Sequence, residues 1–305
     1  MILVTGGTGM VGSALKSLIP SEHFTSTTEC DLRNSLETER LFSHYRPSEV
    51  IHLAARVGGI KANMENLGEF YYDNIMINTN VLEASRKYEV KKVVSLLSTC
   101  IYPDEVTYPL MEEQIHAGTP HESNFSYAYA KRMLDVQSRA YRKQYGCNFI
   151  TAVPNNLFGE NDNFDLEDSH VIPAMIRKIY HASLTNEDVP LWGDGSPLRE
   201  FTYSKDLATI LMFLLKEYDG EYPINIGNTK EYSIKEVAQT IAKIMRFNGK
   251  IIWQTEMPSG QHKKPSDSSK FKSICDTNYT DFEKALRNTC NWFIMNYPSI
   301  RGITT

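Results

Sequence analysis

Short apolar runs alternate with longer amphipathic segments along most of the chain. The runs that suit buried strands cover residues 2–5, 49–54, 92–97, 149–153 and 222–226. Segments of helical length between them cover residues 69–88, 127–144 and 204–217. This repetition of strand and helix predicts an α/β fold with a doubly wound parallel sheet and helices on both faces.

The regular pattern weakens after Gly159, where an acidic, turn-rich stretch follows at residues 160–165. Ser233 and Glu236 form a capping box, which predicts a helix running to about residue 247. We therefore expect two lobes, an N-terminal nucleotide-type domain and a smaller C-terminal part that covers it. Residues 258–269, rich in Ser, Lys and Pro, are the candidate flexible segment.

Composition excludes several classes of protein. The 305 residues carry 32 basic and 37 acidic side chains, and the net charge of −5 argues against a sequence-independent nucleic-acid binder. No apolar run approaches the ~18 residues that span a bilayer, and the apolar start is too short for a signal peptide. Five cysteines without a C-x-x-C pair favour neither disulfides nor a metal site, and they fit a reducing cytoplasm.

A glycine-rich turn directly follows the first predicted strand. Gly6, Gly9 and Gly12 allow a tight turn and a close approach to a pyrophosphate, and the helix that follows aims its first N–H groups at it. The pattern therefore predicts dinucleotide binding rather than a structural turn.

Asp31 lies about 19 residues past Gly12, near the end of a possible second strand. Its carboxylate either contacts the adenosine of the dinucleotide or caps a helix that begins near Leu32. No arginine stands in the turn or immediately before Asp31, so the residues alone leave NADP and NAD both open.

Ser98, Tyr127 and Lys131 are candidate catalytic residues. The spacing of four places Tyr127 and Lys131 on one helix face, where the ammonium is expected to lower the pKa of the phenol. Such a tyrosine can exchange a proton with a carbonyl or hydroxyl, and Ser98, at a strand end, can hold the same oxygen. The order of these residues along the chain favours catalysis over an exposed surface pair.

Cys100 and His170 are less specific candidates. If residues 98–100 are extended, the Cys100 thiol points to the same side as Ser98. It is then either a base activated by a cation or a small thiol packed under the cofactor. His170 is either a helix N-cap residue or a general acid.

Taken together, these motifs resemble the extended short-chain dehydrogenase/reductase family. The resemblance is carried by the turn at Gly6 to Gly12, by Ser98 and by YAYAKR from Tyr127. Within the family, a branch that epimerises and reduces a GDP-sugar is similar along the whole chain, on HLAARVGGI (from His52), STCIYP (Ser98), DNF (Asp162), SHVIP (Ser169), LWGDG (Leu191) and GQHKK (Gly260). Related dehydratases carry an Asp-Glu pair after the threonine, and simple 4-epimerases lack Cys100.

The resemblance implies a Rossmann-like domain that binds NADP over residues 1–160, to which residues 195–228 return. Residues 161–305 then mainly bind substrate. The implied reaction converts GDP-4-keto-6-deoxy-D-mannose to GDP-L-fucose, by C3 and C5 epimerisation and then reduction of the C4 ketone by NADPH.

The resemblance also implies roles for single residues. Ser98, Tyr127 and Lys131 would form the reductase triad, while Cys100 removes the C3 and C5 protons and His170 returns them. The cofactor contacts would be Gly6, Gly9, Met10, Val11, Gly12, Asp31, Ala54, Lys131 and His170. The substrate contacts would be the cations Lys178, Arg199 and Lys264, which are otherwise solvated surface charges, and the aromatic Trp192.

Two other functions stay open. One is a nucleotide-sugar 4-epimerase or reductase without ring epimerisation, against which Cys100 and His170 argue. The other is a silent dinucleotide-binding protein that senses redox state, against which Ser98, Tyr127 and Lys131 argue. Since the family commonly dimerises through helices matching residues 69–88 and 127–144, a homodimer is expected, with no nucleic-acid or membrane partner.

Overall fold

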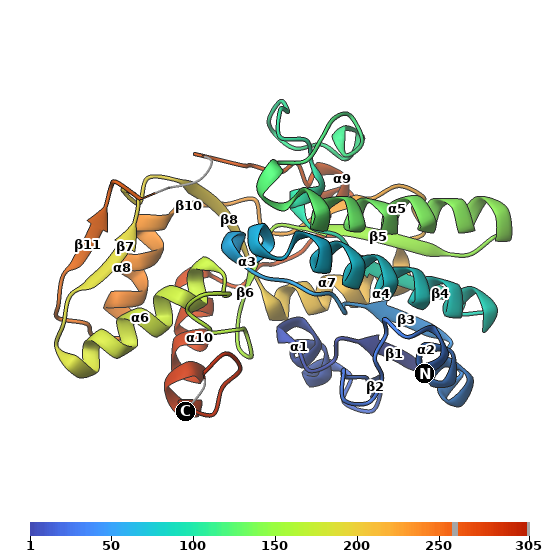
Figure 1. The fold of residues 1–305 in the computed structure, drawn as a ribbon, viewed down its shortest axis with the longest axis horizontal. Coiled ribbons are helices and arrows are strands. Elements are labelled where there is room, and N and C mark those ends of the chain that lie inside the picture. The colour runs from blue at the N-terminus through green and yellow to red at the C-terminus, as the bar shows by residue number, and fades with distance from the viewer. Residues whose placement is uncertain (258–261, 304–305) are drawn as a thin grey trace.

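A parallel sheet forms the centre of the larger lobe in the computed structural model, which describes residues 1–257 and 262–303 (Figure 1). Its strand order is β2-β1-β3-β4-β5-β9, and every pair in it is parallel. The strands are β1 (Ile2–Thr5), β2 (His23–Phe24), β3 (Glu49–His52), β4 (Lys92–Leu96), β5 (Phe149–Pro154) and β9 (Ile224–Ile226).

Helices cover both faces of this sheet because each face is apolar. The helices α1 (Met10–Leu18) and α7 (Ser204–Glu217) pack on one face. The other face is covered by α2 (Ser35–Tyr45), α4 (Leu67–Lys87) and α5 (Phe125–Tyr145), with the short α3 (Ile60–Glu65) preceding α4. The predicted doubly wound α/β fold is confirmed.

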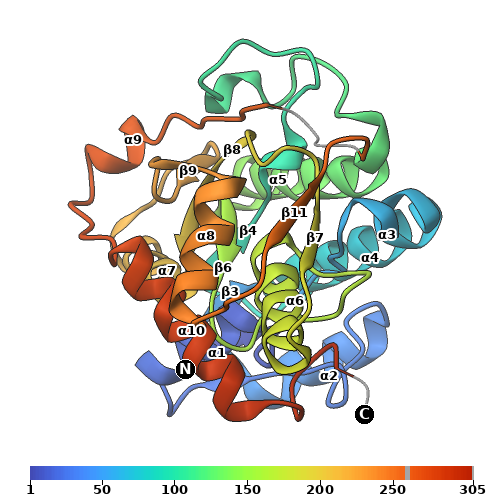
Figure 2. The same cartoon turned by 90° about the vertical axis from the view of Figure 1, so that its left-hand side faces the viewer.

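The smaller lobe has its own apolar core and lies at one end of the larger lobe (Figures 1 and 2). One of its sheets has the strand order β10-β8-β6, with β8 in the centre, and the other pairs β11 with β7. Its strands are β6 (Asn156–Phe158), β7 (Val189–Trp192), β8 (Leu198–Tyr203), β10 (Glu231–Ser233) and β11 (Ile251–Gln254). Its helices are α6 (Val171–Thr185), α8 (Ile234–Ile244) and α10 (Phe282–Asn296), while α9 (Ser269–Lys272) lies against β9 of the main sheet. Within the described ranges, no helix combines the length and apolar character that crossing a membrane requires.

Two local predictions had different outcomes. The capping box is confirmed, because the Ser233 hydroxyl accepts the Glu236 N–H at 3.1 Å and the Glu236 carboxylate accepts the Ser233 N–H at 2.7 Å. The candidate flexible segment is hydrogen-bonded in its described part, where Leu198 N–H donates to the His262 carbonyl at 2.7 Å and Leu110 N–H to the Pro265 carbonyl at 2.9 Å, and its flexibility stays a prediction. The rest of that segment, residues 258–261, lies outside the described residues.

A chain of buried hydrogen bonds joins β1, β3, α4 and α5 where the strands end. The Thr5 hydroxyl accepts the N–H groups of Leu53 and Ala54, each at 3.2 Å, and therefore donates to His52 Nδ1 at 2.7 Å. His52 Nε2–H then donates to Asn78 Oδ1 at 3.0 Å, and Asn78 Nδ2 donates to the Ala130 carbonyl of α5 at 3.4 Å. Burial, together with the Lys131 charge, lowers the pKa of His52 to about 3.

This neutral histidine predicts a pH-dependent contribution to stability. Between pH 6.5 and about 3 the unfolded chain protonates its histidine while the folded chain does not. As the pH is lowered through that window, the free energy of unfolding of the wild type should therefore fall, relative to that of a His52→Gln variant, by about 1.4 kcal/mol per pH unit. Urea unfolding of both proteins at pH 7, 6 and 5 measures it. The comparison with the variant is needed because burial raises the pKa of Asp162 to about 7, and this carboxyl stabilises the folded chain as the pH is lowered. Its contribution is present in both proteins and cancels in the difference. A difference that is constant with pH would contradict the prediction.

Candidate active site

The glycine turn forms a cradle that matches a dinucleotide pyrophosphate. Gly6 has a left-handed φ of +69°, and a Cβ there would lie 2.9 Å from the Ala54 nitrogen. A Cβ on Gly12 would lie 2.5 Å from the Gly6 oxygen, so both glycines are required by the packing of the turn itself. Gly9 is the N-cap of α1, where a Cβ would lie 3.3 Å from the Gly6 oxygen, and it precedes the first N–H groups of the helix, those of Met10 and Val11. These residues and Ala54 fit the cofactor by shape and by hydrogen-bonding capacity.

Asp31 is placed differently from the prediction. It follows β2 by seven residues, and Asn34, not Asp31, caps α2. The Asp31 carboxylate instead accepts two hydrogen bonds from the Arg33 guanidinium, from Nε at 2.9 Å and from Nη2 at 2.8 Å. Arg33 holds the pKa of Asp31 below its usual value. The adenosine contact of Asp31 stays a prediction, whereas the N-cap alternative is wrong.

Tyr127 and Lys131 lie one turn apart on α5, as predicted, but their electrostatics differ from the prediction. The Lys131 ammonium donates to the Leu96 carbonyl at 2.9 Å, and burial lowers its pKa to about 8. The pKa of Tyr127 is raised, first by burial and then by the charge of Cys100. The predicted lowering of the Tyr127 pKa by Lys131 is therefore wrong for this structure, because loss of water around the phenol dominates.

Ser98 and Cys100 meet through a turn and not through an extended strand. Ser98 begins a 3₁₀ helix, Thr99–Ile101, and its hydroxyl oxygen lies 3.5 Å from the Cys100 N–H. The condition of an extended run at residues 98–100 is not met, because the chain turns two residues after β4. Burial raises the pKa of the Cys100 thiol, while Ser98, Lys264 and Lys131 lower it. The thiol, the Ser98 hydroxyl and the phenol of Tyr127 thus act on one another within one site.

Arg132 is a residue that the sequence analysis did not single out. It follows Lys131 on α5 and is only 3% exposed. Its guanidinium donates from Nε to the Ile101 carbonyl and from Nη1 to the Gly118 carbonyl, each at 2.6 Å. It thereby holds the turn that carries Cys100. The only signal in the sequence was an arginine on the apolar face of a helix.

His170 occupies the N-cap position of α6, yet its side chain makes no capping hydrogen bond. The residue is exposed, and partial loss of water around the imidazole lowers the pKa of His170. The N-cap alternative is confirmed for the backbone of His170, and its role as a general acid stays a prediction.

Three half-buried cations lie in the smaller lobe and its connections. Burial lowers the pKa of Lys178, Arg199 and Lys264, and Lys264 also interacts electrostatically with Cys100 and Arg199. Among the described residues, neither Lys178 nor Arg199 has a carboxylate within ion-pair distance. Trp192, 56% exposed, ends strand β7. Partly desolvated cations without an ion-pair partner suit an anionic ligand, and an exposed aromatic ring suits stacking on an aromatic base.

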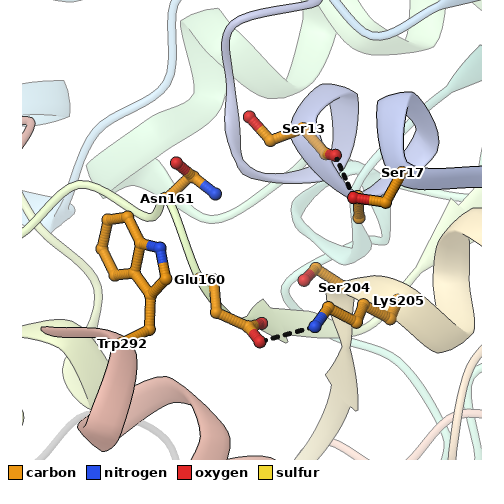
Figure 3. Close-up of a pocket in the computed structure, with 8 residues that line it drawn as sticks. Ser13, Ser17, Glu160, Asn161, Ser204, Lys205 and Trp292 are labelled. Atoms are coloured by element: carbon orange, nitrogen blue, oxygen red, sulfur yellow. Dashed lines mark hydrogen bonds and ion pairs between the residues drawn. The ribbon is translucent and has the colours of Figure 1, made fainter. Parts of the chain in front are cut away.

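A polar hollow of about 180 Å³ lies where α1, α7 and α10 meet (Figure 3). In it the Lys205 ammonium donates to the Glu160 carboxylate at 2.7 Å, as does the Tyr203 hydroxyl. Because Glu160 neutralises the Lys205 ammonium, we describe this hollow as part of the interface between the lobes. It shares no residue with the candidate catalytic set.

A model of the NAD dependent epimerase/dehydratase family matches residues 2–227. The match covers most of the chain, including the glycine turn and the site around Ser98 and Tyr127. The chain belongs to this family.

Family members of known name are similar from end to end. The chain is 44% identical to the GDP-L-fucose synthase of Dictyostelium discoideum, with 98% of this chain and 97% of that protein covered. It is 41% identical to a probable GDP-L-fucose synthase of Drosophila melanogaster, with 98% and 99% covered. A structure of a GDP-L-fucose synthetase from Naegleria fowleri bound to NADP matches with a TM-score of 0.94 and 41% identity, covering 98% of this chain and 94% of that one.

The electrostatic environment of Cys100 yields a direct prediction. A Lys264→Met variant removes a charge that lowers the pKa of Cys100, so the pKa should rise and alkylation of Cys100 by iodoacetamide at pH 8 should slow by roughly tenfold. Mass spectrometry of the Cys100 peptide, followed over pH, measures this rate. Lys263→Met, which removes the exposed neighbouring charge, is the matched control and should leave the rate unchanged. Equal rates in all three proteins would refute the interaction.

Proposed function

We propose that this chain is an NADPH-dependent enzyme that converts GDP-4-keto-6-deoxy-D-mannose to GDP-L-fucose. It would epimerise C3 and C5 and then reduce the C4 ketone. The observation that carries the proposal is the meeting of Cys100 with Ser98 and Tyr127, because a simple reductase has no use for a thiol there. The end-to-end similarity to proteins named GDP-L-fucose synthase supports the substrate.

In the epimerisation, the C4 ketone acidifies the neighbouring C–H bonds. The Cys100 thiolate takes the proton from C3, and in a second round from C5, while Ser98 and Tyr127 donate hydrogen bonds to the enolate oxygen. His170 returns a proton on the opposite face. Its lowered pKa makes the imidazolium a ready acid, and its exposure lets it take up a new proton from water.

In the reduction, the hydroxyls of Ser98 and Tyr127 hold the C4 oxygen. When bound, the nicotinamide supplies a hydride to C4. Tyr127 gives its phenolic proton to the same oxygen, and the raised pKa of the buried phenol keeps that proton in place until the alkoxide forms. Lys131 stands one turn away, and its charge favours the resulting phenolate.

Binding is divided between the lobes in this proposal. Residues 1–160, with the returning segment 195–228, would hold the cofactor, and residues 161–305 mainly the substrate. Lys178, Arg199 and Lys264 would neutralise the diphosphate, and Trp192 would stack on the base.

NADPH is the proposed cofactor because no free carboxylate that would repel a 2′-phosphate follows β2 directly. The loop there carries the hydroxyls of Ser26, Thr27 and Thr28, which can donate to a 2′-phosphate. The next carboxylates are occupied, Glu29 by His23 and Asp31 by Arg33. We propose the cytoplasm as the compartment, since all five cysteines are free thiols.

A Cys100→Ser variant tests the central assignment. Because a serine hydroxyl is far less acidic than a thiol, deuterium wash-in from solvent at C3 and C5 of GDP-4-keto-6-deoxy-D-mannose should fall by at least ~100-fold. Mass spectrometry and NMR of the sugar measure it, and the NADPH affinity should not change. Wash-in at the wild-type rate would remove Cys100 as the base.

Tyr127→Phe is the matched counterpart. It should suppress NADPH consumption while retaining deuterium wash-in above that of Cys100→Ser. Wild-type enzyme given substrate and NADPH should form GDP-L-fucose. Formation of a C4-reduced sugar without epimerisation would favour the simple reductase instead.

A homodimer is proposed on an apolar surface over α4 and α5, which lie side by side (Figure 1). A hollow of about 430 Å³ opens between them. Tyr71, Tyr72 and Val136 are 43%, 58% and 39% exposed on these helices. Two copies of such a surface, packed together, would form a four-helix contact.

The dimer predicts a clear response to a charge. Tyr72→Glu should shift the mass in sedimentation equilibrium at micromolar concentration from dimer to monomer, because the carboxylate would be buried without a partner. Leu184→Glu changes a residue that is similarly exposed, at 64%, but lies on α6, and this variant should remain dimeric. A dimeric Tyr72→Glu variant would place the interface elsewhere.

A further inference from the structure

Lys264 lies on a strap, defined as residues 262–268, which crosses between β8 and the loop around Leu110. Leu198 N–H donates to the His262 carbonyl at 2.7 Å on one side. On the other side, Leu110 N–H donates to Pro265 at 2.9 Å and Asp267 N–H to Leu110 at 2.9 Å. The strap therefore has a fixed path, and the position of the Lys264 ammonium depends on it.

A buried carboxylate fastens the middle of this strap. Glu200 on β8 is 2% exposed, and its side chain accepts the Ser266 N–H at 3.0 Å and the Ser266 hydroxyl at 2.5 Å. Asn155 Nδ2 donates to the same carboxylate at 3.3 Å. A buried carboxylate is costly unless several donors satisfy it, and here the strap supplies two of them.

Both residues of this contact have a cation close to them in the sequence. Ser266 follows Lys264 by two residues, and Glu200 directly follows Arg199. The charge of Arg199 lowers the pKa of Lys264, so the two cations repel each other. Lys264 also acts on the Cys100 thiol, whose pKa it lowers. Something must hold Lys264 against the repulsion, close to both Arg199 and Cys100.

We propose that Glu200 is a positioning residue that clasps the strap through Ser266 and thereby sets Lys264 beside Cys100 and Arg199. Glu200 then contributes to substrate binding and to ionisation of the thiol without touching the substrate. The part that concerns the substrate rests on the proposed function. The part that concerns Cys100 does not.

The strap has a second anchor that keeps the fold independent of Glu200. Asn225 Nδ2 donates to the Asp267 carbonyl at 3.0 Å and to the Leu110 carbonyl at 2.9 Å. Its side-chain oxygen accepts the Tyr102 hydroxyl at 2.6 Å. Variants at Glu200 and Ser266 should therefore fold, with a strap that is loosened near Lys264 and still attached at Asp267.

Two variants, Glu200→Gln and Ser266→Ala, test the clasp. Glu200→Gln replaces one acceptor oxygen by a donor, and Ser266→Ala removes the hydroxyl without changing any charge. In both, alkylation of Cys100 at pH 8 should slow by about three- to tenfold and the apparent pKa of Cys100 should rise. The Kd for GDP should rise about tenfold, as expected for one lost charge-assisted contact, while the Kd for NADPH should not change.

The direction of the effect separates positioning from direct electrostatics. Loss of the negative charge of Glu200 would by itself lower the pKa of Cys100, so a rise in Glu200→Gln points to a displaced Lys264. In a Lys264→Met background, neither variant should change the alkylation rate further.

Alkylation that is unchanged or faster in both variants would overturn the inference, as would an equal slowing in the Lys264→Met background. A GDP affinity equal to that of wild type in both variants would also count against it. If the wild-type protein does not bind GDP at all, the proposed function fails, and the alkylation measurements still decide the role of Glu200. Should Glu200→Gln fail to fold, Ser266→Ala decides alone.

Discussion

Cys100 is half-buried, and the partial loss of water around its thiol opposes the negative charge that a base must carry. The positive charges near the thiol stabilise the thiolate in place of water. Lys131 belongs to α5 in the larger lobe, whereas Lys264 arrives on a strap more than a hundred residues later. The reactivity of one thiol thus depends on two charges that the fold must deliver from different parts of the chain and hold in place.

The parallel sheet explains why the first part of this set comes together. The carboxyl ends of β1, β3 and β4 lie at one edge, so the loops after them share one space. Gly6 follows β1, Ala54 follows β3 and Ser98 follows β4. The buried chain from Thr5 through His52 to Asn78 fixes these loops relative to α5 with neutral hydrogen bonds. Because His52 is neutral, the chain places no second positive charge next to Lys131.

Much of the fold was predictable because it depends on local patterns. The strands of the larger lobe, its long helices and the capping box at Ser233 follow from apolar runs and from short-range chemistry. The elements that were misplaced, such as β2, or missed, such as the paired strands β7 and β11, are short or lie at an edge. Their stability comes from partners distant in the chain, so their own residues carry little signal. The division of labour between the lobes stays a prediction.

The sequence by itself determined the dinucleotide turn, the candidate residues Ser98, Cys100, Tyr127 and Lys131, and the family. Residue type and spacing are enough for these, because each motif is local. Only the tertiary structure decided how the residues act on one another. It showed that Ser98 and Cys100 meet through a turn, that burial raises the pKa of Tyr127, and that Glu200 holds the strap of Lys264. Desolvation and the position of a distant charge depend on the whole packed molecule, and no spacing along the chain encodes them.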